Sequence, residues 1–435
     1  MKPKIPEGWI VTGWSGRLYP CNTARTRFNQ WSGAQRFLWN RLRDREKAEY
    51  AATGKFLWRK HLQPIAVSMK RQSETAWLAD LPAHAVLDTV ARLDGALRRM
   101  VAERKAGRKC GFPKAKKKFV NEAGIYCVGQ ATSFETRERM RGTETELEAR
   151  AVVLPKIGRV RLRGGAMPHK HKVLSGRIWR DGDRWMFSAQ LAVPRPAPLA
   201  ASDAVIGIDL GVTTLVTSYD GSDFHEVAAP KRLRKALRRL RRAQRAQSRR
   251  KKGSARRRAA GRRVTAIHRR VREQRKDILH KESHRLTTKA GVLKVETLNV
   301  RGMARNRHLA LSVADAGMAR LVTFCRYKAD WRGRRVVEID RWFPGSQTCC
   351  KCDALHPEMK MKKGFREMMI CECGNRIGRD RNAAVNHYRY PEETGNRGSC
   401  APTRVEIGEQ GLAPVPVGET RTLAGVELNS DHESQ

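Results

Sequence analysis

The sequence predicts a multidomain α/β protein, and three observations lead to that class. The chain has 435 residues, more than a single hydrophobic core usually holds. Along the chain, segments whose apolar residues alternate every second position, as in strands, are interspersed with segments whose apolar residues recur every three or four positions, as in helices. A Pro-rich stretch at 193–198, Val-Pro-Arg-Pro-Ala-Pro, separates two such series and predicts a domain boundary.

The charge of the chain narrows the class of partner. Lys and Arg number 89 against 43 Asp and Glu, for a formal net charge of +46. A chain this basic repels itself unless a polyanion neutralises it, which favours nucleic acid and strongly salt-dependent binding. A membrane surface is the other polyanion, but the sequence has no long apolar run and residues 1–10 lack an apolar signal core. We therefore expect no membrane association and a cytoplasmic location.

The N-terminal half predicts strands around a helical block. Residues 9–19 suit a strand, residues 28–42 repeat apolar side chains at helical spacing, and a second helix follows Pro82 through Met100. The basic segment 104–118 contains Gly107, Gly111 and Pro113 and predicts a loop that could lie on phosphate. Further strands are expected at 152–154, 160–162, 176–179 and 185–191, suited to a small barrel.

The strand after the Pro-rich stretch carries a single carboxylate. Residues 204–210 are apolar except for Asp209, and Gly211 follows at once, so we expect a buried strand that ends in a tight turn. Strands at 215–219 and 224–227 come next. Such a start is typical of an RNase H-like nuclease core, although Gly-x-Asp-x-Gly also occurs in sugar-kinase-like ATPases and in ordinary turns.

The most basic segment of the chain spans residues 231–276, with 23 Lys or Arg among 46 residues and one acid, Glu273. Two short apolar stripes on either side of Gly253 predict an antiparallel helical hairpin. A solvated charged face normally mixes signs, so a nucleic-acid backbone is the better interpretation. The side chains expected to contact nucleic acid are Arg234, Arg238, Arg241, Arg242, Arg245, Arg249, Arg256, Arg262, Arg269, Arg272 and Lys276.

The remaining elements complete an RNase H-like order. A strand at 291–298 carries Glu296 one residue past its apolar run, a helix is expected at 313–327, and a strand at 335–340 follows. A last helix begins with Ala383, and Asp380 stands just before it. Alone, Asp380 could be a helix cap.

Three carboxylates at three expected places form a more specific signal than any one of them. Asp209, Glu296 and Asp380 together would hold two Mg²⁺ ions about 4 Å apart, so that one activates water and the other stabilises the departing oxygen of a phosphodiester. Glu338 and Asp340 are competing third ligands, which we rank lower because their strand leads toward the cysteine-rich segment.

The cysteines predict a structural metal site. Of ten cysteines, five lie between Cys349 and Cys373. Cys349 and Cys352 have the usual two-residue spacing of a zinc ribbon, whereas Cys371 and Cys373 form a tighter Cys-x-Cys pair. Cys350 could replace a neighbour, and reduced cysteines without metal remain the alternative. Because all four ligands would be Cys, this zinc would be structural.

These motifs resemble the TnpB family, the RNA-guided nucleases of insertion sequences, which are akin to compact type V CRISPR effectors. The resemblance is carried by five motifs and covers most of the chain. The motifs are Gly207-Ile208-Asp209-Leu210-Gly211, Val295-Glu296-Thr297-Leu298-Asn299-Val300, Ser346-Gln347-Thr348-Cys349-x-x-Cys352, Cys371-x-Cys373-Gly374 and Asp380-Arg381-Asn382-Ala383-Ala384-x-Asn386. Gly378 departs from the acidic residue of many relatives.

The resemblance implies a two-lobed organisation. The expected parts are a wedge-like β-barrel at 1–20 and 122–195, a helical recognition domain at 21–121, a linker at 196–203, a RuvC-like nuclease at 204–345 and 376–391 with the basic hairpin at 231–286, an inserted zinc ribbon at 346–375, and a disordered tail at 392–435.

The resemblance also implies an activity. It assigns catalysis to Asp209, Glu296 and Asp380, and zinc to Cys349, Cys352, Cys371 and Cys373. The expected protein is a prokaryotic monomer, associated with the nucleoid when on DNA, that binds a guide RNA from its element or a CRISPR locus. It would recognise a short target-adjacent motif and hydrolyse double-stranded DNA. The alternatives are a nuclease-silent RNA-guided DNA binder and a guide-independent transposase or resolvase.

Overall fold

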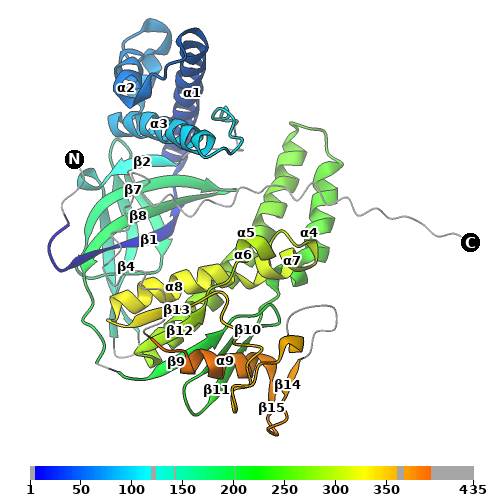
Figure 1. The fold of residues 1–435 in the computed structure, drawn as a ribbon. Coiled ribbons are helices and arrows are strands. Elements are labelled where there is room, and N and C mark those ends of the chain that lie inside the picture. The colour runs from blue at the N-terminus through cyan, green and yellow to red at the C-terminus, as the bar shows by residue number, and fades with distance from the viewer. Residues whose placement is uncertain (1–4, 119–123, 142–143, 201, 360–366, 393–435) are drawn as a thin grey trace, which may run out of the picture. The chain divides into compact units, whose positions relative to one another are not determined.

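The computed structural model describes residues 5–118, 124–141, 144–200, 202–359 and 367–392. The chain divides between Pro194 and Arg195 into two compact units (Figure 1). The tail predicted at 392–435 lies, after Glu392, outside the described residues. Within the described ranges, no helix combines the length and apolar character needed to cross a membrane.

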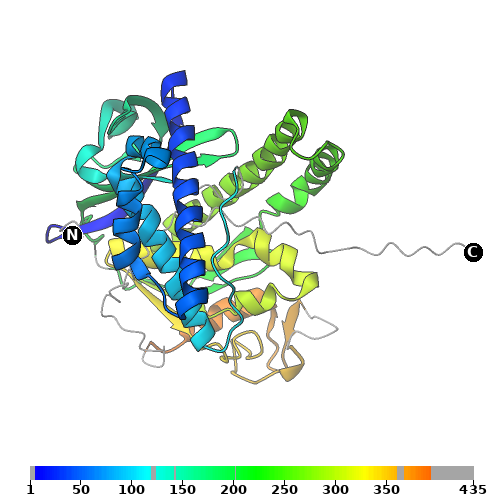
Figure 2. The same cartoon turned by 90° about the horizontal axis from the view of Figure 1, so that it is seen from above.

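The first unit combines an eight-stranded antiparallel sheet with a helical insertion. Its strands are β1 (Trp9–Tyr19), β2 (Ile125–Val128), β3 (Ser133–Arg141), β4 (Glu144–Leu154), β5 (Gly158–Gly164), β6 (Ala166–Met167), β7 (Lys172–Asp181) and β8 (Arg184–Pro194). Its helices are α1 (Asn22–Thr53), α2 (Trp58–Ser68), α3 (Ala83–Lys105) and the 3₁₀ turns η1 (Ser73–Asp80) and η2 (Gly129–Ala131). Figure 2 shows α1 beside the helices that follow it.

The sheet runs in the order β2-β7-β8-β1-β5-β4-β3, with β6 paired to β4. Its strands β2, β3 and β6 and the first half of β4 were missed by the sequence prediction. For β3 and β4 the reason is that 133–150 is rich in Glu and Arg rather than in apolar residues. In the sheet these charges face each other across strands, as in Arg137 opposite Glu148 and Arg139 opposite Glu146, where opposite charges support pairing.

The helical insertion packs through the apolar positions that the sequence predicted. In α3 the side chains of Val86, Val90, Leu93, Leu97 and Met100 are all buried. Figure 1 shows these helices above the sheet, to which Phe28 of α1 is joined by its ring contact with Trp185, 5.1 Å between centroids. The N-terminal strand and the two predicted helices are thus confirmed.

The second unit is built on a five-stranded sheet in the order β11-β10-β9-β12-β13. Strands β9, β12 and β13 are parallel, and β10 and β11 are antiparallel to their neighbours. The strands are β9 (Val205–Asp209), β10 (Thr214–Tyr219), β11 (Phe224–Ala228), β12 (Val292–Glu296) and β13 (Arg335–Ile339). The strands predicted after the Pro-rich stretch are therefore confirmed in place and order.

The helix predicted at 313–327 is wrong as a single element. The chain forms α6 (Val300–Met303), α7 (Arg307–Ala316) and α8 (Met318–Trp331), and Gly317 separates the last two with a φ of 75°. A side chain at Gly317 would be strained in this left-handed conformation and would also lie 3.2 Å from Leu279. The apolar spacing continues through the break, which is why the periodicity did not reveal it.

The basic segment forms two antiparallel helices, α4 (Arg232–Ser248) and α5 (Ala255–Lys289), as predicted (Figure 1). Gly253 turns the chain with a φ of 86°, and Ser254 caps α5 by accepting a hydrogen bond from the Arg257 amide. At the base of the hairpin, buried Asp315 of α7 accepts the Leu233 and Arg234 amides and pairs with Arg275. This carboxylate ties both helices to the sheet-bearing part of the unit.

The C-terminal elements are a short hairpin of β14 (Met368–Ile370) and β15 (Arg376–Gly378), the 3₁₀ turn η3 (Pro357–Met359) and α9 (Arg379–Arg389). Helix α9 begins at Arg379, four residues before the predicted start at Ala383. Asp380 therefore lies inside the first turn and does not cap the helix from outside. Gly378 is the residue at the cap position, with an extended ψ of 136°.

Candidate functional site

Strand alternation places two carboxylates on one face of the central sheet. In β9, Ile206 and Ile208 pack in the core with α5 and α8 residues, so Gly207 and Asp209 face the opposite side. In β12 the same alternation turns Lys294 and Glu296 to that side. Helix α9 covers this face, since Lys294 Nζ donates hydrogen bonds to the carbonyls of Tyr388, in its last turn, and of Tyr390, just after it.

Asp209 and Glu296 end neighbouring parallel strands. The recorded pairing ends with Ile208 opposite Val295, so the two carboxylates follow one residue later at the same sheet edge. The Leu210 amide donates a hydrogen bond of 3.0 Å to Glu296 Oε1, which holds that side chain across β9. Asp380 approaches from the first turn of α9. The charges of Glu296 and Asp380 act on Asp209, and that of Asp380 acts on Glu296, so the three predicted acids lie in one partly buried neighbourhood.

The pKa values of the three carboxyls record this crowding. Burial, and then the charges of Glu296 and Asp380, raise the pKa of Asp209 well above its ordinary value. Burial raises the pKa of Glu296 to about 7, although its hydrogen bond from Leu210 opposes the shift. Burial also raises the pKa of Asp380. Hard carboxylate oxygens that ionise with difficulty together are suited to divalent cations, which remove the repulsion.

Arg379 is a member of this neighbourhood that the sequence analysis missed. Its side chain is buried, it lowers the pKa of all three carboxyls, and it donates a hydrogen bond of 3.1 Å to Ser346 Oγ. Glu338 and Asp340, the competing ligands proposed from the sequence, make other contacts in the structure. Glu338 forms an ion pair of 2.6 Å with Arg326, and Asp340 Oδ1 accepts the Trp342 amide in a turn.

Helix α9 is held close to β9 by backbone contacts. An ideal Cβ at Gly207 would lie 2.2 Å from the Ala384 carbonyl oxygen and 2.3 Å from the Tyr388 nitrogen. Buried His387 is hydrogen-bonded through Nδ1 to the Ile208 carbonyl at 2.8 Å. Burial lowers the pKa of His387 to about 4, so its ring is neutral and Nδ1–H is the donor. These contacts hold α9, which carries Asp380, against the strand that ends in Asp209.

The raised pKa of Glu296 predicts an unusual dependence of stability on pH. A folded-state pKa of about 7, above the ordinary 4.5, gives stability that is present at low pH and lost as the pH rises through 7. A divalent cation bound by these carboxylates would offset this loss. We therefore expect Mg²⁺ to raise the melting temperature more at pH 8 than at pH 5.5, measured by differential scanning fluorimetry.

The matched control for this measurement is Glu296→Gln, which cannot titrate. The variant should show a smaller difference between the two pH values. An equal effect of Mg²⁺ at both pH values in the parent protein would contradict the assignment of the cation to these carboxyls.

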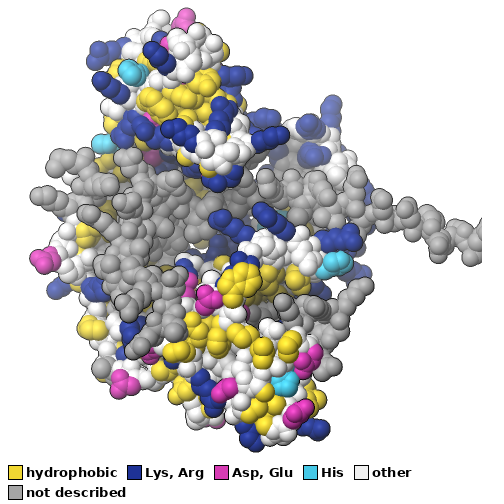
Figure 3. All heavy atoms as spheres, in the orientation of Figure 1, with side chains coloured by type: hydrophobic (Ala, Val, Ile, Leu, Met, Phe, Trp, Pro, Cys, Tyr) yellow, Lys and Arg dark blue, Asp and Glu magenta, His cyan; other side chains and the backbone are white. Residues whose placement is uncertain are grey.

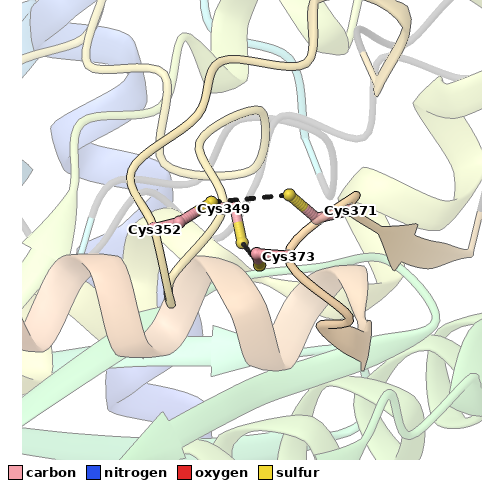
Figure 4. A group of neighbouring side chains, drawn as sticks. All are labelled: Cys349, Cys352, Cys371 and Cys373. Atoms are coloured by element: carbon pink, nitrogen blue, oxygen red, sulfur yellow. Dashed lines mark hydrogen bonds between the residues drawn. The ribbon is translucent and has the colours of Figure 1, made fainter.

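Four cysteines form a second site, beside α9. The sulfur atoms of Cys349, Cys352, Cys371 and Cys373 all lie within 4.8 Å of one another (Figure 4). Cys349 and Cys373 are 3.7 Å apart, and Cys352 and Cys371 are 3.5 Å apart. Among the residues that the structure describes, no other group of acidic, His or Cys ligands is gathered so tightly.

The surroundings of Cys349 favour its thiolate, whereas the neighbouring cysteines and burial raise the pKa of Cys352 and of Cys371. Burial alone would raise the pKa of Cys349, but the amides of Lys351 and Cys352 and the side chain of Asn375 donate to its sulfur and lower that pKa to about 6. Cys350 lies outside the cluster, and its amide donates to Asn382 Oδ1 at 2.9 Å. The structure thus selects the four predicted cysteines over Cys350.

The loop that precedes Cys349 is hydrogen-bonded to α9 by two asparagines whose role the sequence analysis did not identify. Asn382 Nδ2 and Asn386 Nδ2 each donate to the Thr348 carbonyl at 2.7 Å, and Asn386 also donates to Gly345 at 2.7 Å. Their spacing of four residues puts both on one side of the helix, which is the available signal in the sequence. The cysteine site and Asp380 therefore share one rigid support.

The predicted nucleic-acid contacts lie on the hairpin, where Figure 3 shows Lys and Arg side chains along the visible face. Of the eleven side chains, nine are exposed and Arg272 is half-buried. The prediction for Arg269 is wrong, because its side chain is buried, with a relative exposure of 5%. Helix α5 packs against both α4 and α8, and Val271 is buried in the same stretch. Arg269 is therefore not available on the exterior as expected.

Comparison with solved structures identifies the class of fold. The chain is similar to the protein in "Cryo-EM structure of the Cas12f1-sgRNA-target DNA complex", with a TM-score of 0.51 over 85% of this chain and 83% of that one. The identity of 14% means that this likeness concerns the fold. A model described as "Cas12f1-like, TNB domain" matches residues 319–387. The fold of this chain is therefore similar to that of the protein in this Cas12f1 complex.

The family follows from sequence relatives. The OrfB_IS605 model, described as "Probable transposase", matches residues 188–307. A Mycobacterium tuberculosis protein named "Putative RNA-guided DNA endonuclease Rv2885c" is 30% identical over 97% of this chain and 96% of its own. A Streptomyces pristinaespiralis protein named "Putative RNA-guided DNA endonuclease" is 31% identical over 94% and 96%. The chain belongs to the TnpB (OrfB_IS605) family.

Proposed function

We propose that the protein is an RNA-guided DNA endonuclease with a RuvC-like nuclease unit. The observation that carries this proposal is that Asp209 and Glu296 end neighbouring strands, that the charge of Asp380 of α9 acts on both, and that the pKa of each acid is raised. The names of the two bacterial relatives support the reaction class. The solved Cas12f1 complex, named for its sgRNA and target DNA, supports RNA and DNA as partners.

The three carboxylates would hold two Mg²⁺ ions. When bound, the ions supply an activated water and stabilise the departing oxygen of the phosphodiester. The protein's own residues prepare this site. The Leu210 amide orients Glu296, Gly207 lets α9, which carries Asp380, approach the strand that carries Asp209, and Arg379 offsets part of the negative charge. No side-chain nucleophile is required.

The four cysteines would hold one structural Zn²⁺. Their sulfur donors are the ligands that zinc prefers in structural sites, and the cluster is closed, without a position for substrate. Through Asn382 and Asn386 the metal would stabilise the start of α9, which carries Asp380. The zinc would therefore support catalysis only through the position of this helix.

Zinc binding gives a direct prediction. Purified protein should contain about one zinc per chain. Cys371→Ser should lose the zinc, because only three of the four thiolate ligands of a tetrahedral site would remain. Elemental analysis measures the zinc, and limited proteolysis reports unfolding of residues 346–375. Cys350→Ser is the matched control and should keep the zinc, since Cys350 lies outside the cluster. Equal loss in both variants would contradict the assignment.

The basic hairpin would contact the phosphate backbone of the guide RNA, or of the duplex that the guide forms with target DNA. Its exposed arginines suit bidentate phosphate contacts, and base pairing would read the sequence. We propose a cytoplasmic monomer that also recognises a short motif beside the target. Relatives of the family and the charge of +46 support this assignment of partners.

The deciding experiment begins with the RNA that co-purifies with the protein. Its sequence should end in a variable guide segment, and a plasmid carrying the matching target should be cut when Mg²⁺ is present. Binding without cutting would favour the nuclease-silent alternative. Cleavage of junction DNA in the absence of RNA would favour a guide-independent transposase or resolvase.

A further inference from the structure

Trp342 is the most exposed large hydrophobic side chain that the structure describes. Its relative exposure is 79%, whereas Trp14, Trp31, Trp39 and Trp185 are buried. We propose that Trp342 is a stacking platform for an unpaired DNA base of the strand that is about to be cut. This inference rests on the proposed nuclease function and adds a positioning residue to it.

The ring is presented by a rigid turn. The Trp342 amide donates to Asp340 Oδ1 at 2.7 Å, and the Phe343 amide donates to the Asp340 carbonyl at 3.1 Å. Phe343 packs edge-on against Tyr390, with 4.9 Å between centroids. An exposed aromatic on a fixed turn loses little conformational entropy when it binds, which suits it to recognition.

The turn leaves the sheet at the edge that carries the carboxylates. Glu296 is opposite Ile339 in the parallel pair of β12 and β13, and Trp342 follows Ile339 by three residues. The same turn continues to Gly345, whose carbonyl accepts the Asn386 side chain of α9. Since His387 of that helix bonds to Ile208 beside Asp209, one hydrogen-bonded support carries both the ring and the acids.

The neighbour of the ring favours nucleic acid over a protein partner. The Arg341 guanidinium lies 5.0 Å from the ring centroid, and its side chain is exposed. A cation on one side of the indole leaves the other side for a base and can contact the adjacent phosphate. Stacking is tolerant of sequence because every base has a π-face, as a guided nuclease requires. Bases within a duplex already stack on each other, so the platform selects unpaired strands.

The test uses the guide-loaded protein in an Asp209→Asn background, so that bound strands remain uncut. The probe is a target whose non-paired strand contains 2-aminopurine, whose fluorescence falls when it stacks on an aromatic ring. The parent should quench the probe at one or two positions near the cut. Trp342→Ala should abolish this quenching, and Trp342→Tyr should restore most of it. Trp77→Ala, the other strongly exposed tryptophan at 51%, is the matched control.

Cleavage kinetics distinguish a role of Trp342 in positioning the DNA strand from a role in the folding of the protein. With Asp209 intact, Trp342→Ala should raise KM for single-stranded target about tenfold or more, with a smaller change in kcat and an unchanged melting temperature. Unchanged quenching and unchanged KM in Trp342→Ala would overturn the inference. Loss of self-association in that variant, without a fluorescence effect, would assign the ring to a protein contact and also overturn it. If the protein with Asp209 intact binds the probe and quenches it but never cuts the matched target with Mg²⁺ present, the proposed function fails and the stacking result stands.

Discussion

Asp209→Asn should reduce guided DNA cleavage by roughly 10³-fold or more and leave binding of guide RNA and target intact. Asn keeps the shape of the side chain but removes the charge that would hold a cation. A loss of several kcal/mol of transition-state stabilisation corresponds to a rate effect of about this size. Asp209 has the strongest expected effect because it ends the central strand, and both other acids act on its pKa.

The measurement is single-turnover cleavage of a matched plasmid, with target binding followed separately. Glu338→Gln is the matched control, since this carboxylate lies on β13 but pairs with Arg326. Its cleavage should stay within a fewfold of the parent. Residual cleavage within tenfold of the parent in Asp209→Asn would contradict the assigned role.

Stability distinguishes a functional role from a structural one at this position. Because burial and neighbouring charges raise the pKa of Asp209, its ionised form destabilises the metal-free fold. Asp209→Asn should therefore raise the melting temperature of the metal-free protein at pH 8. A structural carboxylate would show the opposite change, because its loss would leave hydrogen-bond donors without a partner.

Gly207→Ala should lower both stability and cleavage, although the substitution adds a single methyl group. The new Cβ would lie 2.2 Å from the Ala384 carbonyl oxygen and 2.8 Å from the Tyr388 Cα, both of them backbone atoms that cannot rotate away. Helix α9 would have to move off the sheet. We expect a loss of about 1–3 kcal/mol in unfolding free energy, as for other overpacked cores.

The effect on cleavage should exceed the effect on stability. Movement of α9 shifts Asp380 relative to Asp209, and a displacement of about 1 Å at a catalytic group can cost about a hundredfold in rate. Gly13→Ala is the matched control, because an added Cβ on that strand glycine would meet nothing within 4 Å. Full cleavage by Gly207→Ala would show that the α9 contact is not needed for the site.

The sequence predicted the second unit well because its signals are local. Apolar runs ending in Asp209 and Glu296, the sign and density of charge at 231–276, and paired cysteines each lie within one short segment. The elements absent from the prediction lack such signals. Strand β3 places residues of opposite charge across from β4, and the break at Gly317 interrupts an apolar pattern that continues on both sides.

The sequence by itself therefore determined the family, the strands that end in acids and the four cysteines that cluster. Only the tertiary structure decided which face those acids share, since alternation gives two faces and the packing of α5, α8 and α9 chooses between them. It alone showed that Arg379 lies near the acids and that Arg269 is buried. It also showed that Asn382 and Asn386 hold the loop that precedes Cys349 by hydrogen bonds. The physical reason is that these roles depend on contacts between residues far apart in the chain, which no local pattern encodes.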